Sequence, residues 1–364
     1  MIANVFLYEV IFLSSFLVIP YFILVTSLWF YMCTGLFIYV LNATVTKFRK
    51  RKISISGQGI VISGCDTGFG HDLAKRLDDL GFTVFAGCLY PDENGAKILA
   101  GKNSKRLHIV PMDVGKTESM SEALEYVKAK LPKTGLWGIV SNAGFNVMGD
   151  VEYLTVDLYH KAMNVNFYGM LRLTKAFLPF VRKSRGRVVV VTSVRGLIPF
   201  PGDSAYHATK HALETVSDSL RMEMRKFGVH VSIIEPGNYG LPTACQDARQ
   251  FERYEAEAEE MWRAASVDVK STYRREYLTT MVDKQRSGTF SGSARTTEPV
   301  IDAFVDALLD VSPKTRYLVP GTPFDKNPML ARVYNILPQW LSDYILILRT
   351  GCDLFPSNSG IKQK

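Results

Sequence analysis

Residues 59–70 read GIVISGCDTGFG, and this stretch decides the fold. Its first five residues form a short apolar run, which is typical of a buried strand in a parallel sheet. The glycines that follow let the backbone approach a pyrophosphate closely, and the helix predicted after them adds N–H donors. The stretch therefore predicts a dinucleotide site, with a ligand-free turn as the alternative, although its GxxxGxG spacing differs from GxGxxG. The predicted cofactor residues of this loop are Gly64, Asp66, Thr67, Gly68, Phe69 and Gly70.

Apolar runs and helical stretches alternate along the chain that follows. Further strands are predicted at 83–87, 107–112, 138–141, 188–192 and 229–234, and helices at 119–131, 158–182 and 205–226. This alternation predicts an α/β fold with a doubly wound parallel sheet of the Rossmann type. Residues 317–319 offer a last strand, and we expect the dinucleotide-binding catalytic domain to cover residues 59–325.

Two later segments interrupt the alternation. Residues 246–292 are rich in Glu, Arg and Tyr, and we expect helices that lie over the active site; a solvated helical face without a substrate role is the alternative. Apolar residues return with helical spacing at 329–348. There we favour a helix that contacts a membrane over a docked core helix, because aromatic, Leu and Ile residues dominate it. The C-terminal helical segment is therefore set apart as residues 326–364.

The N-terminal segment is apolar. Between Val5 and Leu41 the only charged residue is Glu9. About 20 apolar residues cross a bilayer as a helix, so this run predicts one transmembrane helix, or two short ones with a turn at Pro20. It is too long for the core of a signal peptide. A buried core helix is the weaker alternative, because polar positions at helical spacing are missing. The membrane anchor is predicted at residues 1–46.

A basic run follows the anchor, within a predicted linker at residues 47–58. Its cations are Lys47, Arg49, Lys50, Arg51 and Lys52. The positive-inside rule places this run on the cytosolic face, and we expect the catalytic domain to face the cytosol too. We expect the membrane to be that of the endoplasmic reticulum. A mitochondrial membrane is the alternative, but the start of the chain lacks the Arg-rich pattern of a transit peptide.

Composition excludes several classes of protein. Hydrophobic residues make up 47% of the 364 residues, which is enough for a sizeable core. The net charge is +8, but five of the cations lie in the basic run, so we expect no nucleic-acid partner. The five cysteines are irregularly spaced, which excludes a disulfide framework and indicates a reducing compartment. His207 and His211 lack a third ligand, so we expect no metal and interpret both as histidines on a helix surface.

Tyr206 and Lys210 stand four residues apart, which puts both on one face of a helix. A free tyrosine has a pKa of about 10, and a neighbouring ammonium favours its phenolate form. The pair can therefore act as general acid and base on an alcohol, although the same spacing is common on protein surfaces. Ser193 follows the predicted strand 188–192, at the edge of the sheet where ligands bind, and its hydroxyl can hydrogen-bond a substrate oxygen.

Taken in order along residues 59–237, these motifs resemble those of the short-chain dehydrogenase/reductase family. The matching set is Gly64, Gly68, Gly70, Asn142, Ala143, Gly144, Asn166, Ser193, Tyr206, Lys210, Pro236 and Gly237. The resemblance implies that Tyr206 is the catalytic acid/base and that Lys210 also holds the nicotinamide ribose. It implies that Ser193 orients the substrate carbonyl and that Asn166 holds a water of the proton relay.

The resemblance also implies cofactor contacts beyond the glycine loop. The tripeptide 142–144 would support the sheet near the adenine side, and Asp113 would contact the adenine. Pro236 and Gly237 complete the predicted cofactor set. We expect NAD rather than NADP, because Asp66 can accept hydrogen bonds from ribose hydroxyls and would repel a 2′-phosphate. The alternative role for this carboxylate is to cap the helix.

Further matches narrow the resemblance to the branch of retinol, hydroxysteroid and D-β-hydroxybutyrate dehydrogenases and extend it to about Leu348. They lie at 63–70, 85–89, 135–138, 235–238 and 261–262. The residues around Asn238 and Arg316 favour the hydroxybutyrate enzymes, whereas the long anchor favours the retinol and steroid enzymes. The chain departs from the pattern of the family at Ser141, Leu241 and His207, where Asn, Thr and, in this branch, Cys are usual.

Three functions remain open at this point. The first is hydride transfer between a nicotinamide cofactor and a lipophilic alcohol or ketone of the steroid or retinoid type. The second is the same chemistry on a small hydroxy acid such as D-3-hydroxybutyrate, with Arg195 as the substrate-binding cation. The third is a catalytically silent dinucleotide-binding scaffold. The resemblance also implies a homo-oligomer formed through the helices that carry Asn166 and Tyr206.

Overall fold

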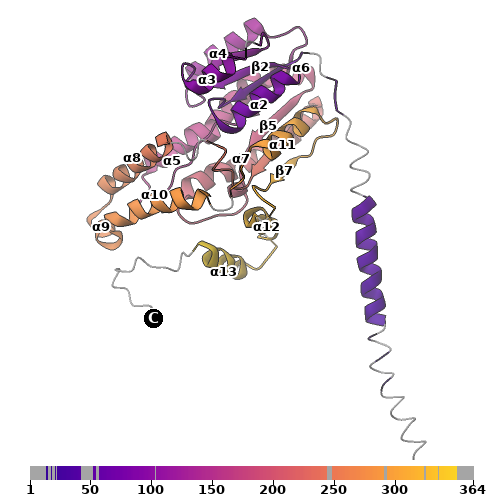
Figure 1. The fold of residues 1–364 in the computed structure, drawn as a ribbon, viewed down its shortest axis with the longest axis vertical. Helices are drawn as coiled ribbons and strands as arrows, with labels where there is room; N and C mark the ends of the chain where they lie inside the picture. Colours follow the sequence, from indigo (N-terminus) through magenta and orange to yellow (C-terminus); the bar gives the residue numbers. More distant parts are fainter. Residues whose placement is uncertain are drawn as a thin grey trace, which may run out of the picture. The chain divides into compact units, whose positions relative to one another are not determined.

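The structure is a computed structural model, and it divides into two compact units, Met1–Lys52 and Ile53–Lys364. The described residues are 14, 18, 21, 23–41, 52–54, 57–102, 104–243, 248–290, 293–323, 325–334 and 336–350. Figure 1 shows the α/β unit as a sheet with helices on both faces.

A single seven-stranded sheet forms the centre of the second unit, and every pair of neighbouring strands is parallel. Its strands are β1 (Gly59–Ser63), β2 (Thr83–Cys88), β3 (Leu107–Pro111), β4 (Leu136–Ser141), β5 (Arg187–Val191), β6 (His230–Pro236) and β7 (Arg316–Val319). The order is β3-β2-β1-β4-β5-β6-β7, so the winding reverses between β1 and β4. Ligands of such sheets bind in the crevice outside the carboxyl ends of the strands at this reversal. The predicted doubly wound sheet and its last strand are confirmed.

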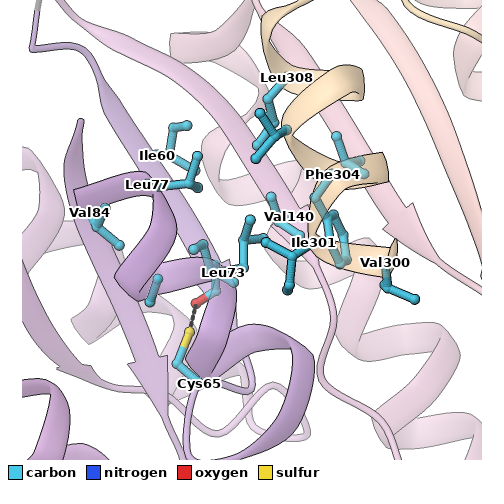
Figure 2. Packing of buried hydrophobic residues seen from close by; sticks show 14 of the residues in the cluster. Ile60, Cys65, Leu73, Leu77, Val84, Val140, Val300, Ile301, Phe304 and Leu308 are labelled. Atoms are coloured by element: carbon cyan, nitrogen blue, oxygen red, sulfur yellow. Dashed lines mark hydrogen bonds between the residues drawn. The ribbon is translucent and has the colours of Figure 1, made fainter. Parts of the chain in front are cut away.

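Helices cover both faces because the strands alternate their side chains. Ile60 and Ile62 belong to the core beneath α2 (Gly68–Asp79), α3 (Asn94–Ala100) and α11 (Glu298–Leu309). Figure 2 shows Ile60 in this core with labelled side chains of α2 and α11. Val61 points to the opposite core. The helices on that side are α4 (Thr117–Lys130), α6 (Gly169–Ser184) and α7 (Ser204–Met224).

Two predicted helices are interrupted in the structure. The helix expected at 158–182 consists of α5 (Val156–Ala162), the π-helix η1 (Met163–Tyr168) and α6. Residues expected to form one helix at 329–348 form α12 (Lys326–Val333) and α13 (Gln339–Thr350) instead. Pro338 directly precedes α13, and a proline removes the N–H that a continuous helix requires.

The segment expected to be helical and to lie over the active site forms three helices. They are α8 (Ala248–Ala264), α9 (Val267–Tyr273) and α10 (Arg275–Phe290). Phe251, Tyr254 and Met261 of α8 are buried in a core that also contains Val147 and Leu158. These helices therefore pack on the chain between β4 and η1, and we call them the lid (Figure 1).

The catalytic unit is larger than residues 59–325. The Ile53 N–H donates to the Leu309 carbonyl at 2.8 Å, and the Ile53 side chain packs on the core beneath α11. At the other end, Leu330 of α12 and Leu346 of α13 share a buried cluster with Val194 and Ile198. The end of the predicted linker and both C-terminal helices thus belong to this unit.

The first unit contains an apolar helix at Ile23–Leu41 with a mean hydropathy of 1.8. Its 19 residues give a length of about 28 Å at 1.5 Å per residue, which matches the apolar core of a bilayer. None of its most apolar window is buried. The basic run up to Arg51, and most of the residues required for a second short span, lie outside the described residues.

Candidate active site

The glycine loop between β1 and α2 is built for close backbone contact. Gly64 has a φ of +73°, and a Cβ on it would stand 2.8 Å from the Cα of Ala143. A Cβ on Gly70 would stand 2.2 Å from the Gly64 carbonyl oxygen. The Asn142 amide donates to the carbonyls of Ser63 at 3.1 Å and of Gly64 at 2.9 Å. The two predicted motifs are therefore one structural unit, in which Asn142 holds the glycine loop.

The loop presents the N-terminus of α2. Thr67 is the N-cap residue and makes no side-chain capping bond. Gly68 follows with a φ of +61°, a conformation that other residues rarely adopt. The phenyl ring of Phe69 packs edge-on against Tyr239, with ring centres 5.4 Å apart. The first N–H groups of α2 thus lack a side-chain cap, which suits a pyrophosphate.

Asp66 links this loop to the residues after β2. Its two carboxylate oxygens accept the N–H groups of Leu89 at 3.0 Å and of Tyr90 at 2.8 Å. It does not cap α2, so the alternative role considered from the sequence is not observed. Asp66 and Thr67 line a cavity of about 420 Å³. We call it the adenosine cavity, because the sequence predicts that Asp66 faces the adenosine ribose there. Its other lining residues are Tyr90, Glu93, Asn94, Gly95, Ala96, Arg249 and Gln250.

Asp113 closes the turn at the carboxyl end of β3. Its carboxylate accepts the Gly115 N–H at 2.9 Å and lies 3.5 Å from the Lys116 ammonium. The structure thus gives Asp113 a local role, and contact with adenine stays a prediction.

Pro236 is the last residue of β6, and Gly237 follows it beside the carboxylate of Asp325. A Cβ on Gly237 would stand 2.2 Å from a carboxylate oxygen of Asp325. That oxygen accepts the N–H groups of Asn238 and Gly321, each at 3.0 Å. The loop after β6 is thereby tied to the loop after β7, across more than 80 residues of chain.

The predicted catalytic residues meet at the end of β5. Ser193 follows this strand and is buried, and its hydroxyl oxygen accepts the Arg195 N–H at 3.2 Å. Tyr206 lies in the first turn of α7, and the Lys210 ammonium is 5.4 Å from the centre of its ring. Lys210 is buried and donates to the Val191 carbonyl at 3.0 Å. One strand end thus holds both the serine and the lysine, and the lysine faces the tyrosine.

Asn166 joins this group from the π-helix. Its amide donates to the Phe145 carbonyl at 2.9 Å and to the Thr209 hydroxyl at 3.0 Å, and its oxygen accepts the Phe145 N–H at 3.0 Å. A Cβ on Gly144 would stand 3.1 Å from the Asn166 amide oxygen and 3.8 Å from the Lys210 ammonium. Short π-helical segments are frequent at functional sites, and here one directs Asn166 to the loop after β4.

A cluster of charges lies behind Lys210. Burial lowers the pKa of Lys210 to about 8, and the carboxylate of Glu214, one turn further along α7, partly offsets this. Glu214 pairs with Arg316 of β7, which also contacts Glu235 at 2.7 Å and Asp218 at 2.5 Å. We did not anticipate this cluster, although the four-residue spacing between Lys210 and Glu214 was visible in the sequence.

Arg195 and His207 lie close together at this site, and for His207 the structure corrects the interpretation from the sequence. The Arg195 guanidinium pairs with Asp203 and lies over the Phe200 ring, with 5.9 Å between its carbon and the ring centre. Its role as a substrate-binding cation stays a prediction. His207 is buried rather than on the helix surface, and its Nδ1 bonds the Arg195 carbonyl at 2.7 Å. Burial lowers the pKa of His207 to about 4, so it is neutral at pH 7.

Both histidines of the suspected metal pair bond backbone carbonyls. The His211 Nδ1 lies 3.0 Å from the His207 carbonyl oxygen. Among the described residues, no group of three His, Cys, Asp or Glu side chains is placed to hold a metal ion.

A glycine cradle at the reversal of a parallel sheet, beside a Ser–Tyr–Lys group, defines a dinucleotide-dependent oxidoreductase. The sequence model of the short chain dehydrogenases matches residues 58–252. The chain therefore belongs to the short-chain dehydrogenase family, and it is an NAD(P)-dependent oxidoreductase.

Known relatives confirm the branch that the motifs indicate. Mitochondrial D-beta-hydroxybutyrate dehydrogenase of Bos taurus is 41% identical over 267 residues, which cover 72% of this chain and 77% of the relative. 17-beta-hydroxysteroid dehydrogenase type 6 of Bos taurus is 37% identical over 322 residues, or 88% of this chain and 96% of the relative. A short-chain dehydrogenase/reductase from Burkholderia phymatum, solved with NAD, shares the fold with a TM-score of 0.63 at 19% identity, and covers 78% of this chain and 95% of its own.

We predict that Tyr206→Phe abolishes most turnover, because the ring remains but the proton-transferring hydroxyl is lost. General acid–base groups contribute about 10²–10⁴-fold, so kcat should fall at least about a hundredfold while the affinity for NADH stays within about threefold. Steady-state kinetics and NADH fluorescence titration measure both. The matched control is Tyr159→Phe, which loses a 2.5 Å hydrogen bond to Ser204 at the start of the same helix. Wild-type turnover in Tyr206→Phe would refute the role.

A second prediction concerns stability. Burial, and then the charge of Glu214, raise the pKa of Glu235 to about 7 from 4.5. The folded chain therefore holds this proton more tightly than the unfolded chain does. The resulting stability is complete below pH 4.5 and is lost as the pH rises through 7. We expect Glu235→Gln to reduce the decline in the free energy of unfolding across this window.

Chemical denaturation of the full chain in detergent, at several pH values, measures this decline. Glu118→Gln, which changes an exposed carboxylate in the first turn of α4, is the control. If the wild type and Glu235→Gln decline equally, the buried Glu235 carboxyl is not the cause.

Proposed function

We propose that the chain is a membrane-anchored, NAD-dependent oxidoreductase that interconverts a lipophilic alcohol and its ketone or aldehyde, of the steroid or retinoid type. The observation that carries the chemistry is the convergence of Ser193, Tyr206 and Lys210 beside the glycine loop. The observation that favours a lipophilic substrate is the apolar helix Ile23–Leu41, because apolar substrates accumulate in the bilayer.

The roles of the residues follow from their chemistry. A bound nicotinamide dinucleotide accepts or supplies the hydride. The Tyr206 hydroxyl gives a proton to the substrate oxygen during reduction and takes it back during oxidation. The Lys210 ammonium, beside the Tyr206 ring, favours the phenolate form by its charge. The Ser193 hydroxyl hydrogen-bonds the substrate oxygen, and Asn166 holds the loop after β4 and a water of the proton relay.

The lining of the adenosine cavity supports NAD over NADP. Two of its side chains, Asp66 and Glu93, carry a negative charge, and one, Arg249, carries a positive charge. The Arg249 guanidinium already pairs with Glu93 at 2.8 Å. A 2′-phosphate would add two negative charges to this surface, whereas ribose hydroxyls can donate to Asp66. The residues after β2, Leu89 and Tyr90, offer no cation.

Membrane attachment rests on two parts of the chain. The helix Ile23–Leu41 is long and apolar enough to span a bilayer, and the basic run after it favours a cytosolic catalytic unit at the endoplasmic reticulum. The name of the hydroxybutyrate relative keeps a mitochondrial membrane as the alternative. In the C-terminal helices and the turn between them, exposed apolar side chains suit a bilayer interface. They are Met329, Ile336, Trp340, Tyr344 and Leu348.

A second candidate substrate is a small hydroxy acid. The 41% identity to a D-beta-hydroxybutyrate dehydrogenase favours it. The pairing of Arg195 with Asp203 weakens this case, because Asp203 already compensates part of the charge that a substrate carboxylate would need. Arg195→Ala distinguishes the two cases: selective loss of hydroxy-acid turnover would support this substrate, and equal losses on all substrates would not.

We also propose that the chain forms a homo-oligomer through the helical segments that carry Asn166 and Tyr206, which are η1 and α7. Each presents an apolar side chain to solvent: Tyr168 at the end of η1 is 49% exposed, and Met222 of α7 is 63% exposed. Size-exclusion chromatography with light scattering of the detergent-solubilised chain tests this, and a monomer would refute it.

We expect membranes that carry the chain to form NADH from NAD with retinol or a hydroxysteroid, and to be less active with NADP. Membranes with Tyr206→Phe give the background rate. Turnover of D-3-hydroxybutyrate alone would assign the chain to the second candidate substrate. Absence of any turnover that depends on Tyr206 would refute the proposed activity.

Contact of α13 with lipid gives a further prediction. Trp340 is 69% exposed on this helix. In a Trp29→Phe background, lipids brominated in their acyl chains should quench part of the tryptophan fluorescence of the reconstituted chain. Adding Trp340→Phe should remove that part, because Trp137 is buried and Trp262 is partly buried in the catalytic unit. Equal quenching with and without Trp340 would show that α13 stays in water.

A further inference from the structure

One face of α8 runs along the catalytic unit from the adenosine cavity to the loop after β4. Four residues at intervals of four carry the contacts, and they span about 18 Å at 1.5 Å per residue. Arg249 pairs with Glu93 at 2.8 Å, and Arg253 donates to the Asn146 carbonyl at 2.8 Å. Further along, Glu257 pairs with Lys161 at 3.0 Å. A Cβ on Gly149 would stand 2.8 Å from the sulfur of Met261.

The first of these residues, Arg249, stands at the wall of the adenosine cavity. Its guanidinium carbon lies 5.1 Å from the centre of the Tyr90 ring, and its side chain is 54% exposed. Asp66 and Thr67 of the glycine loop line the same cavity. This part of the lid therefore reaches the glycine loop, which lies far from it in sequence.

We propose that Arg249 is a cofactor-binding residue supplied by the lid, whose guanidinium covers the adenosine half of the dinucleotide. The inference rests on the proposed function, because a pyrophosphate at the start of α2 directs the adenosine into the cavity that Asp66 and Thr67 share. A guanidinium is planar and stacks on aromatic faces, as Arg249 already does on Tyr90. An adenine ring offers a second face of the same kind.

The ion pair with Glu93 makes a neutral adenine ring a better partner for the Arg249 guanidinium than a phosphate. Its carboxylate compensates the charge of Arg249 at 2.8 Å and holds the guanidinium at the wall of the cavity. The remaining contacts of the α8 face reach the loop after β4, from Arg253 to Asn146, and α5, from Glu257 to Lys161. An adenosine bound under Arg249 would therefore hold the helix that packs on these elements.

The test separates the two halves of the dinucleotide. The full chain in detergent is titrated with NADH, with ADP-ribose, which lacks the nicotinamide, and with reduced nicotinamide mononucleotide, which lacks the adenosine. We expect Arg249→Ala to weaken NADH and ADP-ribose about tenfold and to leave the mononucleotide unchanged, in line with one lost stacking contact. Arg249→Lys keeps a positive charge that can pair with Glu93 but lacks the planar guanidinium. It should therefore recover only part of the affinity for NADH and ADP-ribose.

Arg286→Ala is the matched control, because it removes another arginine–glutamate pair of the lid, 3.0 Å from Glu255. It should leave all three affinities unchanged. Unaltered binding of ADP-ribose to Arg249→Ala overturns the inference while the proposed function stands. An equal loss for the mononucleotide also overturns it, since the effect would then be a general displacement of the lid. A wild-type chain that binds neither NADH nor ADP-ribose overturns the proposed function as well.

Discussion

The buried ammonium of Lys210 is the interaction on which the site depends. Moving a charge out of water is costly unless partners compensate it. Here the Val191 carbonyl accepts at 3.0 Å, and Glu214 lies one turn further along α7. Glu214 is held in turn by Arg316 of β7, at the edge of the sheet. The position of the lysine that we propose as the partner of Tyr206 is thus set by contacts that cross three strands of the sheet.

The cofactor side is constrained by space rather than by charge. Gly64 and Gly70 leave room for one another and for the loop after β4, and the Asn142 amide fixes that approach. Gly144 lies between the two halves, because a side chain there would press on the Asn166 amide oxygen and would contact the Lys210 ammonium. The glycine cradle and the Tyr206–Lys210 pair are therefore packed close to one another through Gly144 and Asn166.

Local sequence predicts the features that depend on local chemistry. The apolar runs predicted the parallel sheet, because the inner strands β1, β2, β4 and β5 are buried on both faces. The spacing of Tyr206 and Lys210 predicted a shared helix face. Contacts between distant residues had no such pattern. The pairing of Arg316 with Glu214 and Glu235 joins residues about 80 to 100 positions apart, and that of Arg249 with Glu93 joins residues 156 apart. The ion pair between Arg195 and Asp203 was not predicted, because no sequence motif marks the turn that brings the two side chains together.

Asp325 has a consequence for the order of events during synthesis. The N-terminal apolar helix is made first, and a chain emerging from the ribosome can insert it before the rest exists. The loop at Pro236 and Gly237 is different, because it depends on hydrogen bonds to Asp325, in the last eighth of the chain. With the membrane anchoring that we propose, the nascent chain would reach its membrane before this loop is held in place. A chain that stops short of this aspartate would keep the apolar helix but lack the hydrogen bonds that shape the loop at Pro236 and Gly237.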